Sequence, residues 1–110
     1  MSNTPTCKWL GQSGKTYAFY IFPIGTVFEP VGGNYVFCTR NAAGKWVPQY
    51  IGQTDNLKDR LADHDKEACA KRNGATHIHA HRNATKADRL AEEKDLIQNY
   101  DPSCNMQHVD

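Results

Sequence analysis

The sequence predicts an α+β domain, in which a small antiparallel or mixed sheet has helices packed on it. Two observations support this prediction. Aromatic and β-branched residues, interrupted by glycine and proline, dominate the first half of the chain, as is typical of strands and turns. In the second half, apolar residues recur mainly at helical spacing. The length of 110 residues is that of a single domain with its own core.

Three strands are expected before the first helix. Residues 16–22 form an aromatic and β-branched run that suits a strand. Two further candidates, residues 34–39 and 45–51, are separated by the short, turn-rich segment 40–44. Because so short a connection can join antiparallel strands, these two are expected to form a hairpin.

A first helix is expected between a cap at Thr54 or Asp55 and a stop at Asn73-Gly74. Its spacing predicts an inner face that comprises Leu57, Leu61, His64 and Ala68.

The rest of the chain predicts one more strand and one more helix. Residues 76–84 alternate in character, which favours a strand. Thr85 is expected to cap the second helix, with Asp88 three residues on, and Pro102 to end it. The inner face of this helix is expected to comprise Ala87, Leu90, Ile97 and Tyr100.

Charge and apolar content exclude several classes of protein. Thirteen lysines and arginines against twelve aspartates and glutamates leave a net charge of +1, whereas proteins that bind polyanions by charge alone are strongly basic. The longest apolar runs, such as residues 17–22, are far shorter than the ~20 residues that span a bilayer. The first six residues lack the features of a secretory signal. A soluble, cytoplasmic protein with no membrane association is therefore expected.

The cysteines are expected to be ordinary thiols. No two of them lie at the spacing of a zinc knuckle or a redox motif, and disulfides are unfavourable in the cytoplasm. The four are Cys7, Cys38, Cys69 and Cys104.

A carboxylate interrupts the apolar stripe of the second helix. Glu93 stands between Leu90 and Ile97 at helical spacing, where an unpaired charge would be costly. A cation is therefore expected beside it. The alternative places Glu93 at the edge of the stripe, paired with Arg89 four residues earlier.

Arg60 and His64 are a second departure from the pattern. Four residues apart, they would lie one above the other on the first helix, where they could contact a phosphate together. The alternative is a solvated flank in a segment rich in charged residues.

A third departure is the run His77, His79 and His81. On a strand, all three imidazoles point to one face and could bind zinc or copper, but the cysteines are not placed to complete such a site. The alternative is a strand face that packs against a helix or faces solvent.

Five short motifs follow one another along the chain: Gly33-Asn34-Tyr35, Tyr50-Ile51-Gly52, Thr54-x-Asn56-Leu57-x-x-Arg60-Leu61-x-x-His64, Glu93-x-x-Leu96-Ile97 and Tyr100-x-Pro102-x-x-Asn105. In order and spacing they resemble the GIY-YIG nuclease superfamily. The resemblance implies a three-stranded antiparallel sheet flanked by helices in a domain over residues 32–106. Residues 1–31 would be an extension with an extra strand, and residues 107–110 a tail.

The resemblance also implies a function, namely hydrolysis of phosphodiester bonds in DNA with one Mg²⁺ or Mn²⁺ ion. It assigns Tyr35 and Tyr50 to the cleavage site, Arg60 to the scissile phosphate, His64 to proton transfer or phosphate contact, Glu93 to the metal, and Gly52, Gln53 and Asn105 to substrate binding or support. DNA, in branched or damaged forms, is the expected partner. The near-neutral charge leaves open whether a partner protein supplies specificity. The alternative function is a binding module that keeps the fold and recognises nucleic acid or a protein without catalysis.

Overall fold

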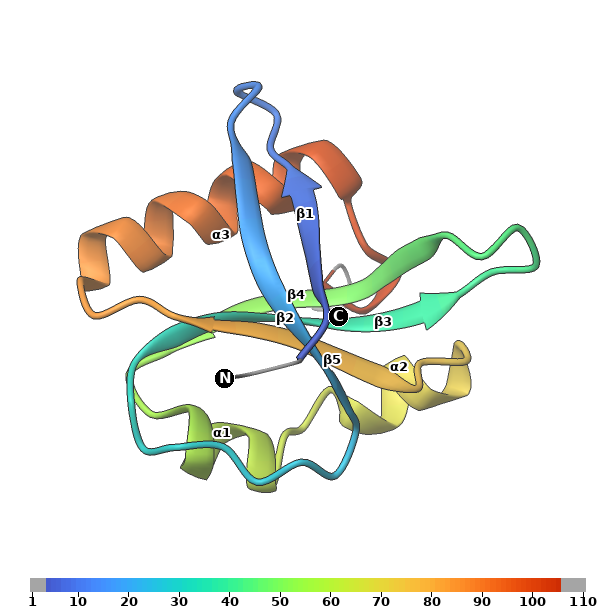
Figure 1. Cartoon of the computed structure of the whole chain (residues 1–110), viewed down its shortest axis with the longest axis horizontal. Coiled ribbons are helices and arrows are strands. Elements are labelled where there is room, and N and C mark those ends of the chain that lie inside the picture. The colour runs from blue at the N-terminus through green and yellow to red at the C-terminus, as the bar shows by residue number, and fades with distance from the viewer. Residues whose placement is uncertain (1–3, 106–110) are drawn as a thin grey trace, which may run out of the picture.

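A computed structural model describes residues 4–105 as an α+β fold with one antiparallel sheet (Figure 1). Its strands are β1 (Thr6–Leu10), β2 (Thr16–Pro23), β3 (Gly33–Arg40), β4 (Trp46–Thr54) and β5 (His77–Arg82), in the order β1-β2-β5-β3-β4. Its helices are α1 (Leu57–Ala62), α2 (Glu67–Arg72), α3 (Lys86–Tyr100) and the short 3-10 helix η1 (Ser103–Asn105). The expected tail, residues 107–110, lies outside the described residues.

The sheet is larger than the expected three strands with one extra N-terminal strand. The additional strand is β1, which pairs antiparallel with β2 from Thr6↔Tyr20 to Leu10↔Thr16. The tight turn between them depends on Gly14, whose φ of +94° is a conformation that favours glycine. The last strand of the chain, β5, then lies between β2 and β3 and joins the first hairpin to the second.

Helices cover both faces of the sheet (Figure 1). Alternate residues of β3 point to opposite faces, so Tyr35 and Phe37 pack with α1 and α2, whereas Val36 and Cys38 pack with α3. Six consecutive residues of β3 are buried because both faces are covered and both edges are paired. The internal strand β3 thus provides a rigid base for side chains at the edge strand β4.

The expected first helix is interrupted. Asn56, rather than Thr54 or Asp55, is its N-cap and accepts a hydrogen bond from the backbone N–H of Asp59. The chain leaves the helix after Ala62 and begins α2 at Glu67, so His64 lies in the turn between two short helices. Asn73 and Gly74, the latter at φ +91°, end α2 as expected.

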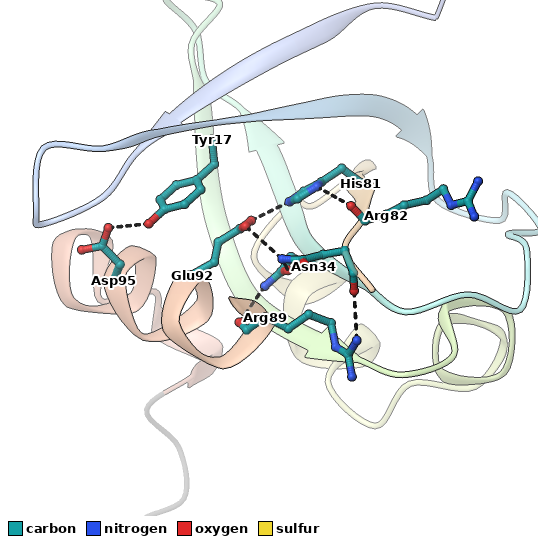
Figure 2. A network of polar contacts seen from close by, with 8 residues as sticks. Tyr17, Asn34, His81, Arg82, Arg89, Glu92 and Asp95 are labelled. Atoms are coloured by element: carbon teal, nitrogen blue, oxygen red, sulfur yellow. Dashed lines mark hydrogen bonds and ion pairs between the residues drawn. The ribbon is translucent and has the colours of Figure 1, made fainter. Parts of the chain in front are cut away.

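The last helix is present as expected, but a different face is buried. Its buried residues are Arg89, Glu92 and Leu96, whereas Leu90 is 42% exposed. Asp95 also joins α3 to the first hairpin, because its carboxylate accepts hydrogen bonds from Ser13 and from the Tyr17 hydroxyl at 2.8 Å (Figure 2). These contacts help to hold α3 against the sheet.

The expectation of four free thiols is wrong for two of them. Cys69 in α2 and Cys104 in η1 form a disulfide, with their Cα atoms 6.0 Å apart across 35 residues of sequence. Cys7 and Cys38 are free. The disulfide attaches the segment after α3 to α2. Among residues 4–105, no helix combines the length and apolar character needed to cross a membrane.

Candidate active site

Two phenol rings lie side by side where β3 meets β4. Tyr35 is 1% exposed and Tyr50 is half-buried, and their ring centroids are 6.2 Å apart with the planes inclined by 29°. Gly52 lies directly opposite Tyr35 in the strand register. A Cβ atom at Gly52 would come within 2.5 Å of the Tyr35 Oη and 2.9 Å of the Tyr50 ring. The absence of a side chain at this position therefore allows both phenols to reach the sheet edge.

His64 turns inward from the α1–α2 turn and contacts the first phenol. Its Nε2 lies 2.7 Å from the Tyr35 Oη, and its Nδ1 accepts a hydrogen bond from the backbone N–H of Lys66 at 2.9 Å. Burial, reinforced by the positive charge of Arg60, lowers the pKa of His64 to about 4. The imidazole is therefore neutral at pH 7. Because Nδ1 is an acceptor, the ring proton is on Nε2, and this N–H donates a hydrogen bond to the Tyr35 oxygen.

Arg60 approaches the phenols from the last turn of α1. Burial raises the pKa of both Tyr35 and Tyr50, and the Arg60 guanidinium partly opposes that rise. Arg60 Nη2 also donates to the Asp65 carboxylate at 2.7 Å, which holds the pKa of Asp65 below its usual range. Since the side chain of Asp65 is 66% exposed, this ion pair is open to competition from solvent and from other anions.

Glu93 approaches from α3, on the other side of β4. Burial raises the pKa of this half-buried carboxyl group, and its negative charge in turn raises the pKa of Tyr35 and Tyr50. Within residues 4–105, Glu93 makes no hydrogen bond and no ion pair. The alternative pairing with Arg89 is absent there too, because the Arg89 guanidinium is bound elsewhere.

The neighbouring Glu92 belongs to a separate, largely buried network of polar side chains (Figure 2). Its carboxylate contacts His81 Nε2 at 2.6 Å and accepts from the Asn83 amide. Asn83 in turn donates to Asn34, which donates to the backbone oxygen of Arg89. Asn34, the middle residue of Gly33-Asn34-Tyr35, is therefore buried in a polar role.

Arg89 is the residue that the sequence interpretation missed most clearly. It is 5% exposed, and its Nε donates to the Gln53 Oε1 at 3.0 Å. Its Nη1 donates to the backbone oxygens of Asn83 at 2.9 Å and Ala84 at 3.1 Å. Gln53 is thus brought to the site, next to Gly52, but its side-chain oxygen is occupied by Arg89.

Asn105 supports the site by binding the backbone of β4. Its Oδ1 accepts from the Ile51 N–H and its Nδ2 donates to the Ile51 oxygen, both at 2.8 Å. It therefore caps the open edge of β4 beside Gly52, and both polar atoms of its side chain are used in doing so. The disulfide at Cys104 holds this segment in place.

The residues present fit a cation bound by a single carboxylate. No group of three or more His, Cys, Asp or Glu side chains within residues 4–105 is placed to enclose a metal ion. Mg²⁺ is commonly bound through one or two carboxylates and keeps several waters. Glu93, which is half-buried without a partner in this part of the chain, has the chemistry of such a ligand.

The three strand histidines have different partners. His77 Nδ1 is 2.8 Å from the Thr76 hydroxyl, and His81 contacts Glu92. His79 is fully buried between Trp9, whose indole donates to its Nδ1 at 3.0 Å, and the ring of Trp46. Burial lowers the pKa of His79 to about 4. At His79 this face of β5 packs into the core, whereas His77 and His81 are only half-buried.

We expect acid to destabilise the fold through His64 and His79. Their folded pKa values of about 4 lie below the unfolded value near 6.5, so the unfolded chain takes up protons first as the pH falls. The contribution of the two neutral imidazoles to folding stability is fully present above about pH 6.5 and is lost towards pH 4. It amounts to at most about 3 kcal/mol per imidazole. The raised pKa of Glu93 acts in the opposite direction and makes the unfolding free energy depend less steeply on pH.

Urea unfolding between pH 7 and 4.5 measures this dependence. A His79→Gln variant should lose about half of the decline in unfolding free energy, whatever its absolute stability. If the unfolding free energy of the variant fell with pH as steeply as that of the wild type, His79 would not be a source of the pH dependence.

Comparison of the chain with protein-family models found no match, and comparison with curated proteins found none.

Proposed function

We propose that this protein is a divalent-metal-dependent endonuclease of the GIY-YIG type that hydrolyses phosphodiester bonds in DNA. The observation that supports it best is the convergence, at one edge of the sheet, of two phenols, a neutral imidazole, a guanidinium and a half-buried carboxylate without a partner in residues 4–105. They come from four elements and the α1–α2 turn: Tyr35, Tyr50, Arg60, His64 and Glu93.

In this proposal the protein groups divide into a phosphate side and a metal side. Arg60 binds the scissile phosphate, because a guanidinium presents donors that match phosphate oxygens and favours the added negative charge of the transition state. To do so it must exchange its exposed partner Asp65 for the phosphate. Glu93 would hold Mg²⁺ or Mn²⁺, which supplies Lewis-acid stabilisation of the charge on the phosphoryl oxygens.

Tyr35 has a defined hydrogen-bonding state in the proposed mechanism. Its oxygen accepts from His64 Nε2–H, so its own proton remains available to a water or a phosphate oxygen. Since burial raises its pKa, the phenol is protonated at neutral pH and orients the attacking water as a donor.

A specific observation favours the second candidate function, a non-catalytic binding module. The Arg60 guanidinium already has an anionic partner in Asp65, and the pKa of each phenol is raised rather than lowered. A protein of this kind would bind nucleic acid or a protein partner without cleaving it.

The test is a cleavage assay with Tyr35→Phe and a matched control. End-labelled duplex, nicked, flap and junction DNA are incubated with the protein in Mg²⁺, Mn²⁺ or EDTA. The wild type should cleave at least one form only with metal, and Tyr35→Phe about a hundredfold more slowly. Tyr100→Phe, which removes a hydroxyl that accepts from the backbone N–H of Leu10 outside the candidate site, should cleave at the wild-type rate.

Two other outcomes are informative. Binding to DNA without cleavage in either metal would support the binding module. Equal rates for Tyr35→Phe and the wild type would exclude the assigned site even if the protein cleaves DNA.

A further inference from the structure

A cavity of about 300 Å³ lies beside the candidate active site, between the sheet and the segment 24–32. Two of its aromatic rings, Phe22 and Phe28, meet edge to face with centroids 5.1 Å apart. Its volume is at the small end of the range for ligand pockets, about 300–1,000 Å³. The apolar walls are Tyr20, Phe22, Phe28, Val31, Leu57 and Ala80.

The cavity is preformed because its covering segment is attached at both ends. The backbone oxygens of Val31 and Glu29 accept from the first N–H groups of α1, at Leu57 and Lys58. At the other end, the Ile24 N–H donates to the Thr76 oxygen. The segment runs alongside α1 in Figure 1. Binding there would not require this wall to be ordered first.

Two charged side chains and one exposed apolar side chain form the rim. Arg82, at the exposed end of β5, makes no side-chain hydrogen bond or ion pair within residues 4–105. Glu29 contributes an exposed carboxylate, and Val27 is 82% exposed at the mouth. The rim therefore combines one cation and one hydrogen-bond acceptor with apolar walls.

The cavity and the proposed phosphate contact share helix α1. Leu57 lines the cavity, and Arg60 follows three residues later, a spacing that places their Cβ atoms about 5–6 Å apart. A second hollow, which Arg60 also lines, contains Asp55, Asp59 and Asp63, and these carboxylates would repel a phosphate backbone. At the cavity rim, by contrast, Arg82 provides a cation without an ion pair within residues 4–105 for the phosphate backbone of a nucleic acid that binds at Arg60.

We propose that this cavity holds an unpaired nucleobase of the nucleic-acid substrate, with Arg82 on the adjacent phosphate. The inference rests on the proposed function and names its substrate class. A base has two apolar faces, which suit Tyr20 and the phenylalanines, and a polar edge whose amino group can donate to Glu29. Bulges, flaps and branch points expose such a base at low cost, whereas paired duplex does not.

The experiment compares binding of a duplex with a single-base bulge and of the matched duplex, by fluorescence anisotropy in EDTA. The wild type should bind the bulged duplex about tenfold more tightly. Val27→Glu, which places a charge at the mouth, should abolish that preference. Leu10→Glu adds the same charge at another exposed apolar residue outside the cavity and should retain it.

Arg82→Gln tests the phosphate contact. It should lower the salt dependence of binding to the bulged duplex, reducing the slope by about one, while Arg72→Gln on the exposed face of α2 leaves it unchanged. Equal binding of both duplexes, or an unaltered preference in Val27→Glu, would overturn the proposal. Deoxycytidine monophosphate that binds as tightly as the bulged duplex would assign the cavity to free nucleotides instead and overturn it.

These readouts separate the cavity from the chemistry. A bulge preference that is lost in Val27→Glu, in a protein that cleaves nothing in Mg²⁺ or Mn²⁺, would support the cavity and overturn the nuclease. Cleavage without a bulge preference would support the nuclease and overturn the proposal for the cavity.

Discussion

Glu93→Gln is expected to reduce metal-dependent DNA cleavage at least about a thousandfold while leaving the fold intact. The amide keeps the shape of the side chain but is a much weaker ligand for Mg²⁺. Because burial raises the pKa of Glu93, its charge costs free energy in the metal-free protein. Removing that charge should therefore leave stability unchanged or raise it slightly.

Two measurements on the same variant test this expectation. Thermal unfolding of the wild type should shift upward with Mn²⁺, because the ion binds the folded state, and the shift should vanish in Glu93→Gln. Single-turnover cleavage gives the rate. Asp88→Asn, the same change at an exposed position of α3, should retain both responses. A Glu93→Gln variant that cleaves at the wild-type rate would show that this carboxylate does not hold the metal.

Arg89→Ala is expected to lower the free energy of unfolding by about 3 kcal/mol. The guanidinium satisfies the oxygens of Gln53, Asn83 and Ala84, and its removal leaves these acceptors, in partly buried hydrogen bonds, without their donor. For a domain of this size the midpoint of thermal unfolding should fall by about 15 °C. Gln53, released beside Gly52, should also make the site less well ordered.

Urea and thermal unfolding of three variants measure this effect. Arg89→Lys should recover part of the loss, because an ammonium can reach a carbonyl but lacks the planar fork. Lys86→Ala, at an exposed position of the same helix, should change stability by less than about 0.5 kcal/mol. A loss below that value in Arg89→Ala would contradict the structural role assigned to the network.

Local pattern predicted most of the strands. The runs at 16–22, 34–39 and 45–51 and the strand at 76–84 correspond to β2, β3, β4 and β5, because aromatic and β-branched residues between turns favour extended chain. The first strand was missed, although Gly11 and Gly14 mark the turn that follows it. A five-residue strand such as β1 carries too few residues for its alternation to stand out.

The rotation of α3 could not be predicted from its apolar residues. Spacing indicated a buried stripe through Leu90 and Glu93, yet Arg89 and Glu92 are the buried polar residues. These two side chains can be buried only because Gln53 and His81, from distant strands, form hydrogen bonds with them. No periodicity within the helix contains that information.

The candidate site was predicted in part. The sequence interpretation grouped Tyr35, Tyr50, His64, Arg60 and Glu93, and the structure brings these side chains to one edge of the sheet. It did not anticipate that Asp65 would pair with Arg60, or that both polar atoms of Asn105 would be used by Ile51.

By itself the sequence determined the character of most segments, because strand and helix periods and turn residues act over a few neighbouring positions. Only the tertiary structure decided the strand order, the disulfide between Cys69 and Cys104, and which carboxylate of Glu92-Glu93 is paired. Each of these depends on contacts between residues far apart in the chain, whose energies arise only once the sheet and helices have packed.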